Sequence, residues 1–543
     1  MFTKACSTGD IANVRKLLSL TGRCAITSQA NLDEAFCKAC ARGRLNVVRE
    51  LLALEGDRRI NVHACNERAF RAACKGAHLD VVRELLSLDG ERTVDVRTVG
   101  GDVMNYACLN GHLGVVCELL ALTGRRAVNV SAMDFAYACH YGDVHVVRAL
   151  LGVRDGRTID MHHRVDQAFT AACKLGHVDI VRELLPLTGA FKVNVCACNG
   201  VPFRLACAHG NTEVVRELLA LQGHRAVDVH VQDEEAFRKA CKNGCLEVVQ
   251  LLLTLSGHRA VDVHALDEEA FRKACENGCL EIVRLLLTLE GDRCINVHAN
   301  QEYGFRAACA CGHVYIARAL MSLDGDRKVN VHAMEEEAFS LACANGHLQL
   351  VQELLALQGD RTIDVHAVEE RAFRRACSSG NIEVVRVLLA LGDDRTVFVH
   401  AQNEKAFREA CLRHDKTVML ELLALQGDRR VDVHVKNYEV FRTAREFKQV
   451  TVMQHLLAMS GERALPHKEQ QKCISFCAHA MEPWTASMQA WMACPVRHHV
   501  HTDTLCPQLK HTLRFRVKEL QWRARRSLLR SRLRINAARR VNR

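Results

Sequence analysis

The chain has 543 residues and a formal net charge of +10 at pH 7. The charge is uneven, because residues 510–543 hold 13 Lys and Arg and one acid, a net charge of +12, which leaves −2 for residues 1–509. No apolar run approaches the roughly 20 residues of a membrane-spanning helix, so we expect no transmembrane segment.

One pattern recurs thirteen times in residues 1–463. An Ala-Cys pair or a near copy has Phe usually four residues before the cysteine, and a segment similar to Val-Val-Arg-Glu-Leu-Leu after it. Successive cysteines are 34 residues apart, except for one step of 31 residues. The marker cysteines are Cys6, Cys40, Cys74, Cys108, Cys139, Cys173, Cys207, Cys241, Cys275, Cys309, Cys343, Cys377 and Cys411. Such a period predicts a solenoid, in which each repeat packs only on its neighbours and an extended surface carries the function.

The marker cysteines also bear on the redox compartment. The chain has 27 cysteines, but stacked elements lie roughly 10 Å apart, which is too far for a disulfide between equivalent positions. We therefore expect buried, reduced thiols and a location in the cytosol or the nucleus. Residues 1–6 already belong to the first repeat, so we expect no signal peptide.

Residues 267–299 illustrate the elements of one repeat. In residues 267–277 a Phe, an Ala and the marker Cys have the i, i+3, i+4 spacing of one helix face, and a Gly follows, which predicts a short first helix. The leucines of residues 279–289 predict a second helix. Residues 295–299, Ile-Asn-Val-His-Ala, alternate apolar and polar side chains, which predicts an extended finger leading to the next repeat.

These elements resemble the ankyrin repeat over roughly residues 1–463. The matching features are the Ala-Cys pair, the Val-Val-x-x-Leu-Leu helix, a Val-Asp-Val or Val-Asn-Val in the place of the finger, and Gly-His between the helices, at Gly111-His112, Gly176-His177, Gly312-His313 and Gly346-His347. The sequence departs from the family at the helix start, which reads Glu-Ala-Phe-Arg instead of Thr-Pro-Leu-His, at the missing Asp-Gly finger tip, and at an added Gly-Asp-Arg. The resemblance implies a mostly α, monomeric solenoid of about 13–14 helix-turn-helix repeats with short extended fingers, followed by a C-terminal segment without repeats.

Tetratricopeptide repeats have the same period, but they carry Trp and a helix-ending Pro at set positions. Residues 1–463 contain no Trp and only Pro186 and Pro202. The segment Gly-Asp-Arg-Val-Asp-Val-His is also too long and too β-like for the short turn of those repeats. The ankyrin type is therefore favoured.

Two repeats depart from the pattern. The three residues missing before Cys139 fall within residues 128–134, in a finger, where a solenoid tolerates a deletion. The last repeat, about residues 437–463, is degenerate, with Arg445 in the cysteine position and Lys448 in the glycine position. A polar terminal repeat suits a cap.

Two polar positions recur around the fingers. The resemblance implies that the finger histidines hydrogen-bond neighbouring fingers; they are His63, His230, His264, His298, His332, His366, His400 and His434. An acid three residues before the Phe is expected to form a solvated pair with an Arg four residues later. These acids are Asp33, Glu67, Asp166, Glu234, Glu268, Glu302, Glu336, Glu370 and Glu404.

Two adjacent positions between the marker Cys and the following Gly vary from repeat to repeat. Residues 234–267 and 268–301 are otherwise near copies, so a position that differs is free of core packing. The resemblance places these pairs, with the fingers, on the concave face that binds proteins. The candidate partner-binding residues are Lys242, Asn243, Glu276, Asn277, Ala310, Cys311, Ala344, Asn345, Ser378 and Ser379.

Beyond the repeats the composition changes. Residues 464–509 form a Cys-, His- and Trp-containing linker or small cap, and the spacing of its Cys and His matches no familiar zinc frame, so we expect no metal. Residues 510–543 form an Arg-rich tail with apolar residues at helical spacing, which suits a basic amphipathic helix. Three roles remain open for it: a nuclear-import signal, a contact with nucleic acid or an anionic membrane, and a solvated disordered end. The candidate contacts are Arg523, Arg525, Arg526, Arg530, Arg532 and Arg534.

The sequence shows no phosphate-binding Gly-rich loop, nucleophile elbow or His pair of a metalloprotease, so we expect no enzymatic activity and no cofactor. The favoured function is a scaffold or adaptor that binds one or more proteins on the concave face. Two alternatives remain open: tethering to nucleic acid or to an anionic membrane through the tail, and recruitment of substrates to a ubiquitin ligase.

Overall fold

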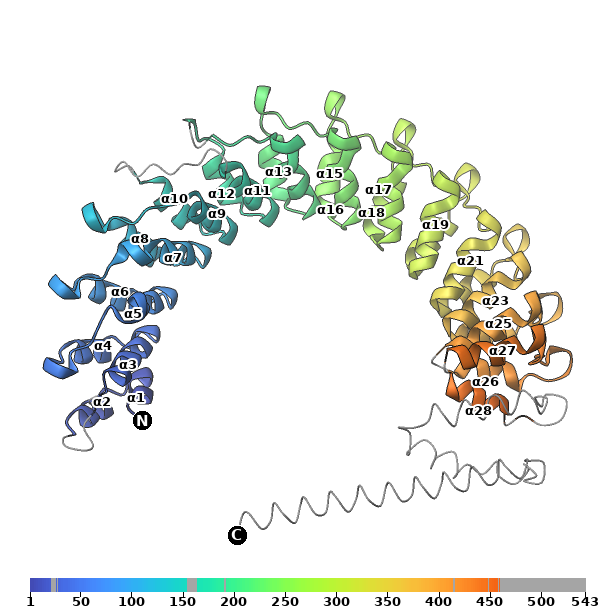
Figure 1. The fold of residues 1–543 in the computed structure, drawn as a ribbon. Coiled ribbons are helices and arrows are strands. Elements are labelled where there is room, and N and C mark those ends of the chain that lie inside the picture. Colours follow the sequence, from blue (N-terminus) through green and yellow to red (C-terminus); the bar gives the residue numbers. More distant parts are fainter. Residues whose placement is uncertain are drawn as a thin grey trace, which may run out of the picture. The chain divides into compact units, whose positions relative to one another are not determined.

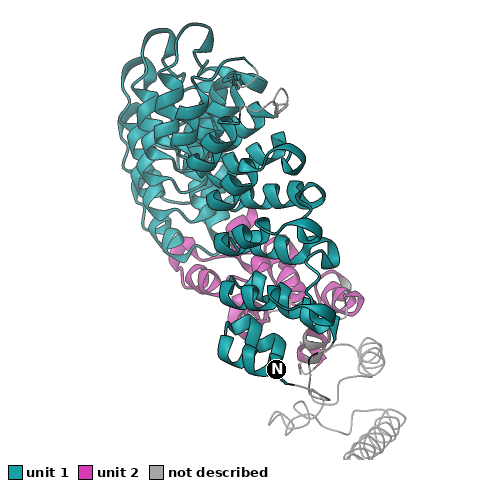
Figure 2. Ribbon diagram, turned by 90° about the vertical axis from the view of Figure 1, so that its left-hand side faces the viewer, with its two compact units in different colours: residues 1–367 teal, residues 368–543 magenta. Residues whose placement is uncertain are grey.

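The structure, a computed structural model, divides the chain into two compact units (Figure 2). Unit 1 comprises residues 1–367 and unit 2 residues 368–543. The described residues are 1–459 except 21–25, 27, 154–163, 190–191, 414–415, 448 and 458. In this part of the chain the regular elements are 28 α-helices and ten short 3-10 helices, without a β-strand.

The α-helices form fourteen pairs, and each pair is one repeat. The first helices are α1 (Phe2–Thr8), α3 (Gln29–Ala41), α5 (Ala64–Lys75), α7 (Val96–Leu109), α9 (Ala132–Tyr141), α11 (Val165–Leu175), α13 (Ala197–Ala208), α15 (Val231–Lys242), α17 (Ala265–Glu276), α19 (Ala299–Cys311), α21 (Ala333–Asn345), α23 (Ala367–Ser379), α25 (Ala401–Leu412) and α27 (Val435–Glu446). The second helices are α2 (Ile11–Leu18), α4 (Leu45–Leu52), α6 (Leu79–Leu86), α8 (Leu113–Ala121), α10 (Val144–Leu151), α12 (Val178–Leu184), α14 (Thr212–Leu219), α16 (Leu246–Leu253), α18 (Leu280–Leu287), α20 (Val314–Met321), α22 (Leu348–Leu355), α24 (Ile382–Leu389), α26 (Thr417–Ala424) and α28 (Val450–Leu457). The 3-10 helices follow the second helices and are η2 (Gly56–Arg58), η3 (Gly90–Arg92), η4 (Gly124–Arg126), η6 (Gly223–Arg225), η7 (Gly257–Arg259), η8 (Gly291–Arg293), η9 (Gly325–Arg327), η10 (Gly359–Arg361), η11 (Asp393–Arg395) and η12 (Gly427–Arg429). The predicted all-α solenoid is confirmed.

Within unit 1 the first helices pack on those of neighbouring repeats from α1 to α21, and the second helices do so from α2 to α20 (Figure 1). Thus α17 contacts α15 and α19, and α18 contacts α16 and α20. The predicted apolar face of α17, formed by Phe271, Ala274 and Cys275, is fully buried. The core is therefore a continuous row of first-helix Phe, Ala and Cys side chains against second-helix Val, Ile and Leu.

All thirteen marker cysteines are buried free thiols, as predicted. Burial raises the pKa of the Cys6 thiol to about 11 and raises the pKa of the other twelve still further. The thiols therefore stay protonated at neutral pH, and they pack as small apolar side chains.

The finger differs from the predicted extended stretch. After η8 the chain is extended only briefly, although Ile295 and Val297 are buried as their alternation predicted. The three residues after Ala299 then form a left-handed turn, with φ of 51°, 55° and 60° at Asn300, Gln301 and Glu302. Left-handed backbone costs a non-glycine residue about 1–2 kcal/mol, so other contacts must hold this turn. The same turn begins the first helix in eight repeats, α5, α13, α15, α17, α19, α21, α23 and α25.

The short repeat lacks this turn. Helix α9 begins directly after Ser131, whose side chain and that of Asp134 form a reciprocal capping box. Val128 and Val130 take the places that the buried pair Ile295 and Val297 have in the full-length repeat. The three missing residues are therefore those of the left-handed turn.

A buried glutamate ends the left-handed turn and connects it to the next repeat. Glu302 is 4% exposed, and its Oε1 accepts hydrogen bonds from the backbone N–H of Asn330 at 3.1 Å and from Nδ1 of His298 at 2.8 Å. The Nε2 of His298 donates to the backbone carbonyl of Asp326 at 2.8 Å. The His–Glu ladder, defined by these three bonds, is repeated at His63, His230, His264, His332 and His400.

This ladder confirms the predicted contacts of the histidines with neighbouring fingers and corrects the prediction for the glutamates. The glutamates are buried and bind the finger of the next repeat, whereas we expected solvated pairs with an Arg four residues later. The acids Asp33 and Asp166 also accept a backbone N–H from the next repeat, in helices that begin without the left-handed turn, so the bond depends on the position of the acid. The expected partner, for example Arg272, instead donates to the carbonyls of Asp267 and Leu266 within its own turn.

Both ring nitrogens of each ladder histidine face an acceptor, an arrangement that favours the protonated ring. The hydrogen bond to the Glu302 carboxylate and then that to the carbonyl of Asp326 raise the pKa of His298 above its ordinary value. The pKa values of His63 and His230 are raised for the same reasons. At His264 and His332 burial is the largest single influence and lowers the pKa, but the same two kinds of hydrogen bond outweigh it.

The Arg of each Gly-Asp-Arg segment forms a second connection between repeats. Arg293 reaches back 40 residues, where its Nη1 donates to the carbonyl of Leu253 at the end of α16, at 3.1 Å. A cation on a terminal helix carbonyl interacts favourably with the helix dipole and satisfies an otherwise open acceptor. This Arg clamp recurs at Arg58, Arg92, Arg126, Arg259, Arg327, Arg361 and Arg429.

Candidate partner-binding surface

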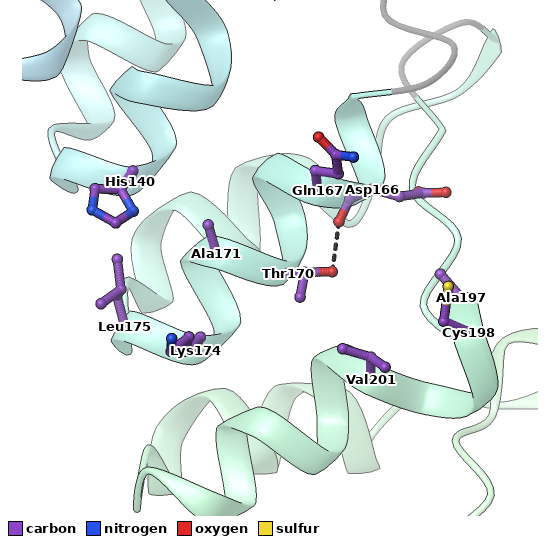
Figure 3. A pocket seen from close by; sticks show the side chains of 10 residues that line it. All are labelled: His140, Asp166, Gln167, Thr170, Ala171, Lys174, Leu175, Ala197, Cys198 and Val201. Atoms are coloured by element: carbon purple, nitrogen blue, oxygen red, sulfur yellow. Dashed lines mark hydrogen bonds between the residues drawn. The ribbon is translucent and has the colours of Figure 1, made fainter. Parts of the chain in front are cut away.

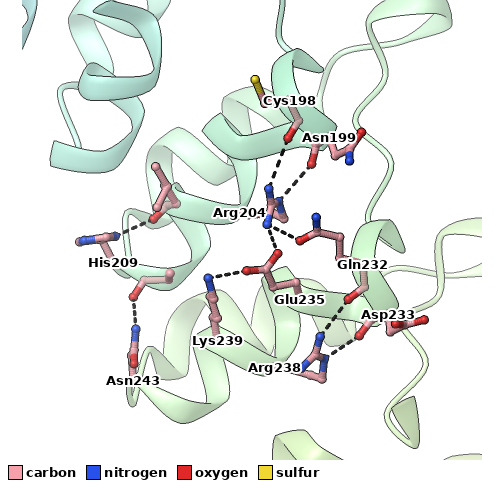
Figure 4. Close-up of polar contacts among 12 residues, drawn as sticks. Cys198, Asn199, Arg204, His209, Gln232, Asp233, Glu235, Arg238, Lys239 and Asn243 are labelled. Atoms are coloured by element: carbon pink, nitrogen blue, oxygen red, sulfur yellow. Dashed lines mark hydrogen bonds and ion pairs between the residues drawn. The ribbon is translucent and has the colours of Figure 1, made fainter. Parts of the chain in front are cut away.

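Ion pairs whose side chains are largely buried, here called charged rungs, connect the first helices of neighbouring repeats. Arg204 on α13 forms an ion pair with Glu235 on α15 (Figure 4), and Arg238 on α15 forms the equivalent pair with Glu269 on α17. The guanidinium of Arg204 also donates to the carbonyl oxygens of Asn199 and Cys198, at the left-handed turn. Each rung thus joins two first helices and holds the turn that begins one of them.

The predicted partner-binding pairs lie where the first helices end. Lys242, Asn243, Asn277, Cys311 and Asn345 are exposed. The other five, Glu276, Ala310, Ala344, Ser378 and Ser379, are half-buried. Ser378 and Ser379 belong to unit 2, and the other eight to unit 1.

Some of these side chains also stabilise the stack. Asn243 donates to the carbonyl of Ala208 at the end of the preceding first helix, at 2.7 Å, and Asn345 donates to that of Ala310 at the same distance. Although exposed, the two asparagines therefore also connect their repeats to the preceding ones. Asn277 donates only within its own helix, to the carbonyl of Lys273.

Glu276 belongs to a cluster that the sequence did not reveal. Its Oε2 accepts hydrogen bonds from Lys273 Nζ at 2.7 Å and from the hydroxyl of Tyr303 at 2.9 Å. Tyr303 replaces the rung glutamate, and the guanidiniums of Arg272 and Arg306 lie 5.2 and 5.7 Å from its ring centroid. The bond to Lys273 lowers the pKa of Glu276, so the carboxylate remains charged at neutral pH.

Three large apolar side chains stand exposed at equivalent helix ends in neighbouring repeats. Leu109 at the end of α7 is 40% exposed, Tyr141 at the end of α9 is 51% exposed, and Leu175 at the end of α11 is 40% exposed. These positions correspond to the predicted variable pairs, but we had selected pairs only from the more regular later repeats. The signal was the apolar character of the same pair positions in residues 96–175.

A pocket of about 490 Å³ adjoins this apolar strip (Figure 3). Its lining includes Ala171 and Leu175 of α11 and Val201 of α13, and the lining surface is mainly apolar. Thr170 and Val201 stand in the positions that hold Arg204 and Glu235 one repeat later. The pocket therefore lies where the charged rung is missing.

Three charged or titratable side chains border the pocket. His140 comes from α9, and Asp166 and Lys174 come from α11. The Asp166 carboxylate already accepts the backbone N–H of Asn194 at 2.7 Å. Lys174 forms no ion pair with any residue that the structure describes.

Several predictions concern residues outside the described part of the chain. These are the segment 464–509, the tail 510–543 and its arginines Arg523, Arg525, Arg526, Arg530, Arg532 and Arg534. Among the described residues no group of three or more His, Cys, Asp and Glu is placed to hold a metal ion. No described helix is long and apolar enough to cross a membrane.

Comparison with known proteins identifies the repeats. A family model of ankyrin repeats (three copies) matches residues 36–134, 135–233, 203–301, 237–333 and 305–399. A search of curated proteins gave no match. Among solved structures, the crystal structure of an engineered protein matches at 14% identity and covers 87% of this chain and 98% of that chain, with a TM-score of 0.14.

Proposed function

The chain belongs to the ankyrin-repeat family, and on this basis we propose that it is a non-enzymatic scaffold or adaptor that binds partner proteins on the exposed face of its first helices. The observation that carries the proposal is the row of exposed, variable residues at the helix ends, such as Lys242, Asn277 and Cys311. A repeat array offers such a row as one long surface. Recognition of a particular partner requires side chains that differ from repeat to repeat on a constant backbone.

The test is a surface substitution that leaves the stacking contacts intact. Lys242→Ser, Asn277→Ser and Cys311→Ser are combined, and Asn243, Asn345 and Glu276 are kept because they bond to neighbouring repeats. Surface substitutions change the free energy of unfolding by no more than about 0.5 kcal/mol each. We expect binding of a partner isolated by affinity purification to fall, as measured by titration calorimetry, while the unfolding temperature stays nearly constant.

The control places equal changes on a second helix. Glu281→Ser and Arg284→Ser alter an exposed pair on α18 whose side chains are 64% and 56% accessible. Partner binding should be unaffected by this control. Equal affinity of the triple variant and the parent would show that the partner does not use these residues.

A second candidate function is attachment to a polyanion through the tail. It is supported by the charge of residues 510–543, which changes the formal net charge from +10 to −2 when they are removed. Clustered cations retain a protein on heparin through a salt-sensitive interaction. We expect the truncated protein to lose retention on a heparin column at moderate salt, and unchanged retention would exclude the tail as the cause.

A further inference from the structure

Between α11 and α13, the position equivalent to a charged rung has neither the Arg nor the Glu. We call this position the vacant rung. Where Arg204 and Glu235 stand in the next repeat, this position has Thr170 and Val201. The preceding rung is similarly reduced, with Ala136 opposite Gln167. Short side chains at consecutive rungs leave the space that is observed as the pocket.

The volume and the lining of the pocket indicate which kind of ligand it can bind. A volume of about 490 Å³ is within the range of small-ligand and side-chain sites, which are mostly apolar with a few polar groups at set positions. The inner surface is formed by Ala171, Leu175 and Val201, so it suits a large apolar side chain. Lys174 at the border suits a carboxylate beside that side chain, because Asp166 is already engaged by Asn194.

The exposed strip extends the same surface. Leu175 lines the pocket, and Tyr141 and Leu109 stand exposed at the ends of the two preceding first helices. Burial of apolar surface contributes about 25 cal/mol per Å². A segment that fills the pocket can therefore gain further affinity by lying along the strip.

We propose that the pocket between α11 and α13 binds a short acidic–apolar segment of a partner protein, with a Leu- or Phe-sized side chain inserted between Thr170 and Val201 and a carboxylate on Lys174. This proposal rests on the proposed scaffold function and names the chemistry of one of its partners. His140 borders the same pocket from α9 (Figure 3).

The probe is a fluorescein-labelled peptide, Glu-Glu-Leu-Phe-Glu-Glu, titrated into the full-length protein and followed by fluorescence anisotropy. Two matched peptides accompany it, one with Ser in place of Leu and Phe, and one with Lys in place of Glu. We expect saturable binding of the first peptide and at least about tenfold weaker binding of both others, a difference of 1.4 kcal/mol.

The decisive variant restores the missing rung. Thr170→Arg with Val201→Glu introduces the pair that Arg204 and Glu235 form one repeat later, so it fills the pocket with side chains that the fold already accommodates. We expect peptide affinity to fall at least about tenfold while the circular dichroism spectrum is unchanged. Leu175→Ser serves as a second variant, because a side chain that is 40% exposed can be changed without unfolding the repeat.

Lys174→Glu tests the charge. It should weaken binding of the acidic peptide and strengthen binding of the Lys peptide. Absence of saturable binding to the parent, equal binding of the Ser peptide, or full affinity in both the restored-rung and Leu175→Ser variants would overturn the proposal. None of these results affects the partner titration with the triple surface variant, so failure of the pocket and failure of the scaffold function are distinguishable.

Discussion

Phe271→Ala is expected to melt a limited part of the array. The side chain is fully buried, and its Cε1 lies so close to Gly304 of the next first helix that a Cβ on that glycine would be 3.0 Å away. Removing a buried Phe costs about 3–5 kcal/mol, because it leaves a cavity that the surroundings fill only in part. The loss falls on the repeats that contact α17, because stacking involves nearest neighbours only.

Hydrogen exchange measured by mass spectrometry checks this result. Protection should be lost in the peptides of α15 to α20 and retained in α1 to α6. Leu266→Ala is the matched control, since Leu266 is 50% exposed in the same repeat and should cost no more than about 0.5 kcal/mol. An equal loss of protection throughout residues 1–367 would contradict nearest-neighbour stacking.

The second large effect is a loss of stability at alkaline pH, caused by the His–Glu ladder. The pKa of each ladder histidine is raised by folding. Folding therefore favours the protonated ring, and this contribution is fully present below the unfolded value of about 6.5. It is lost as the pH rises through the raised folded value, when the deprotonated ring can no longer donate to both acceptors.

The measurement is the unfolding temperature as a function of pH. For the parent we expect a decline that begins above about pH 6.5. The marker thiols do not contribute to it near neutral pH, because burial raises their pKa. Substituting His230, His264, His298 and His332 by Gln should flatten the decline.

The chain itself suggests why Gln is the right substitute. Gln29 occupies the histidine position of its repeat, and its Nε2 donates to Asp33 at 2.9 Å and to the carbonyl of Arg59 at 3.1 Å. It thus bonds the acid of its own repeat and a backbone carbonyl before the next finger without a titrating group, although that carbonyl lies two residues beyond the one that the ladder histidines use. His209→Gln is the control, since that ring bonds only a carbonyl of its own helix, Leu205. An unchanged pH profile in the fourfold variant would show that the ladder is not the cause.

The sequence predicted the helix pairs because their determinants are local. The spacing of Phe271, Ala274 and Cys275 defines one helix face, and the period of 34 residues places an equivalent face in each repeat. The same reasoning did not predict the left-handed turn that begins many of the first helices. Leu266 has φ of 54° and Val368 has φ of 51°, and neither residue type favours left-handed backbone.

What fixes the turn is a contact between repeats. The carboxylate of Glu268 accepts a hydrogen bond from the histidine of its own finger and another from the backbone N–H of Asn296 in the next repeat. The i, i+4 spacing from Glu268 to Arg272 suggested an intrahelical pair, and only the three-dimensional path of the turn excludes it. The pocket is a similar case, since Thr170 and Val201 become informative only when the rung of Arg204 and Glu235 is known.

The Arg clamp makes the last hydrogen bond of a second helix depend on residues that are synthesised later. The carbonyl of Leu253, the last residue of α16, accepts a hydrogen bond from Arg293, which is translated 40 residues later. Since chains fold from the N-terminus as they leave the ribosome, each second helix is finished only after its successor has been made. The newest repeat on a growing chain therefore always has an open helix end, and an interrupted chain would expose the end of its last repeat to proteases and chaperones.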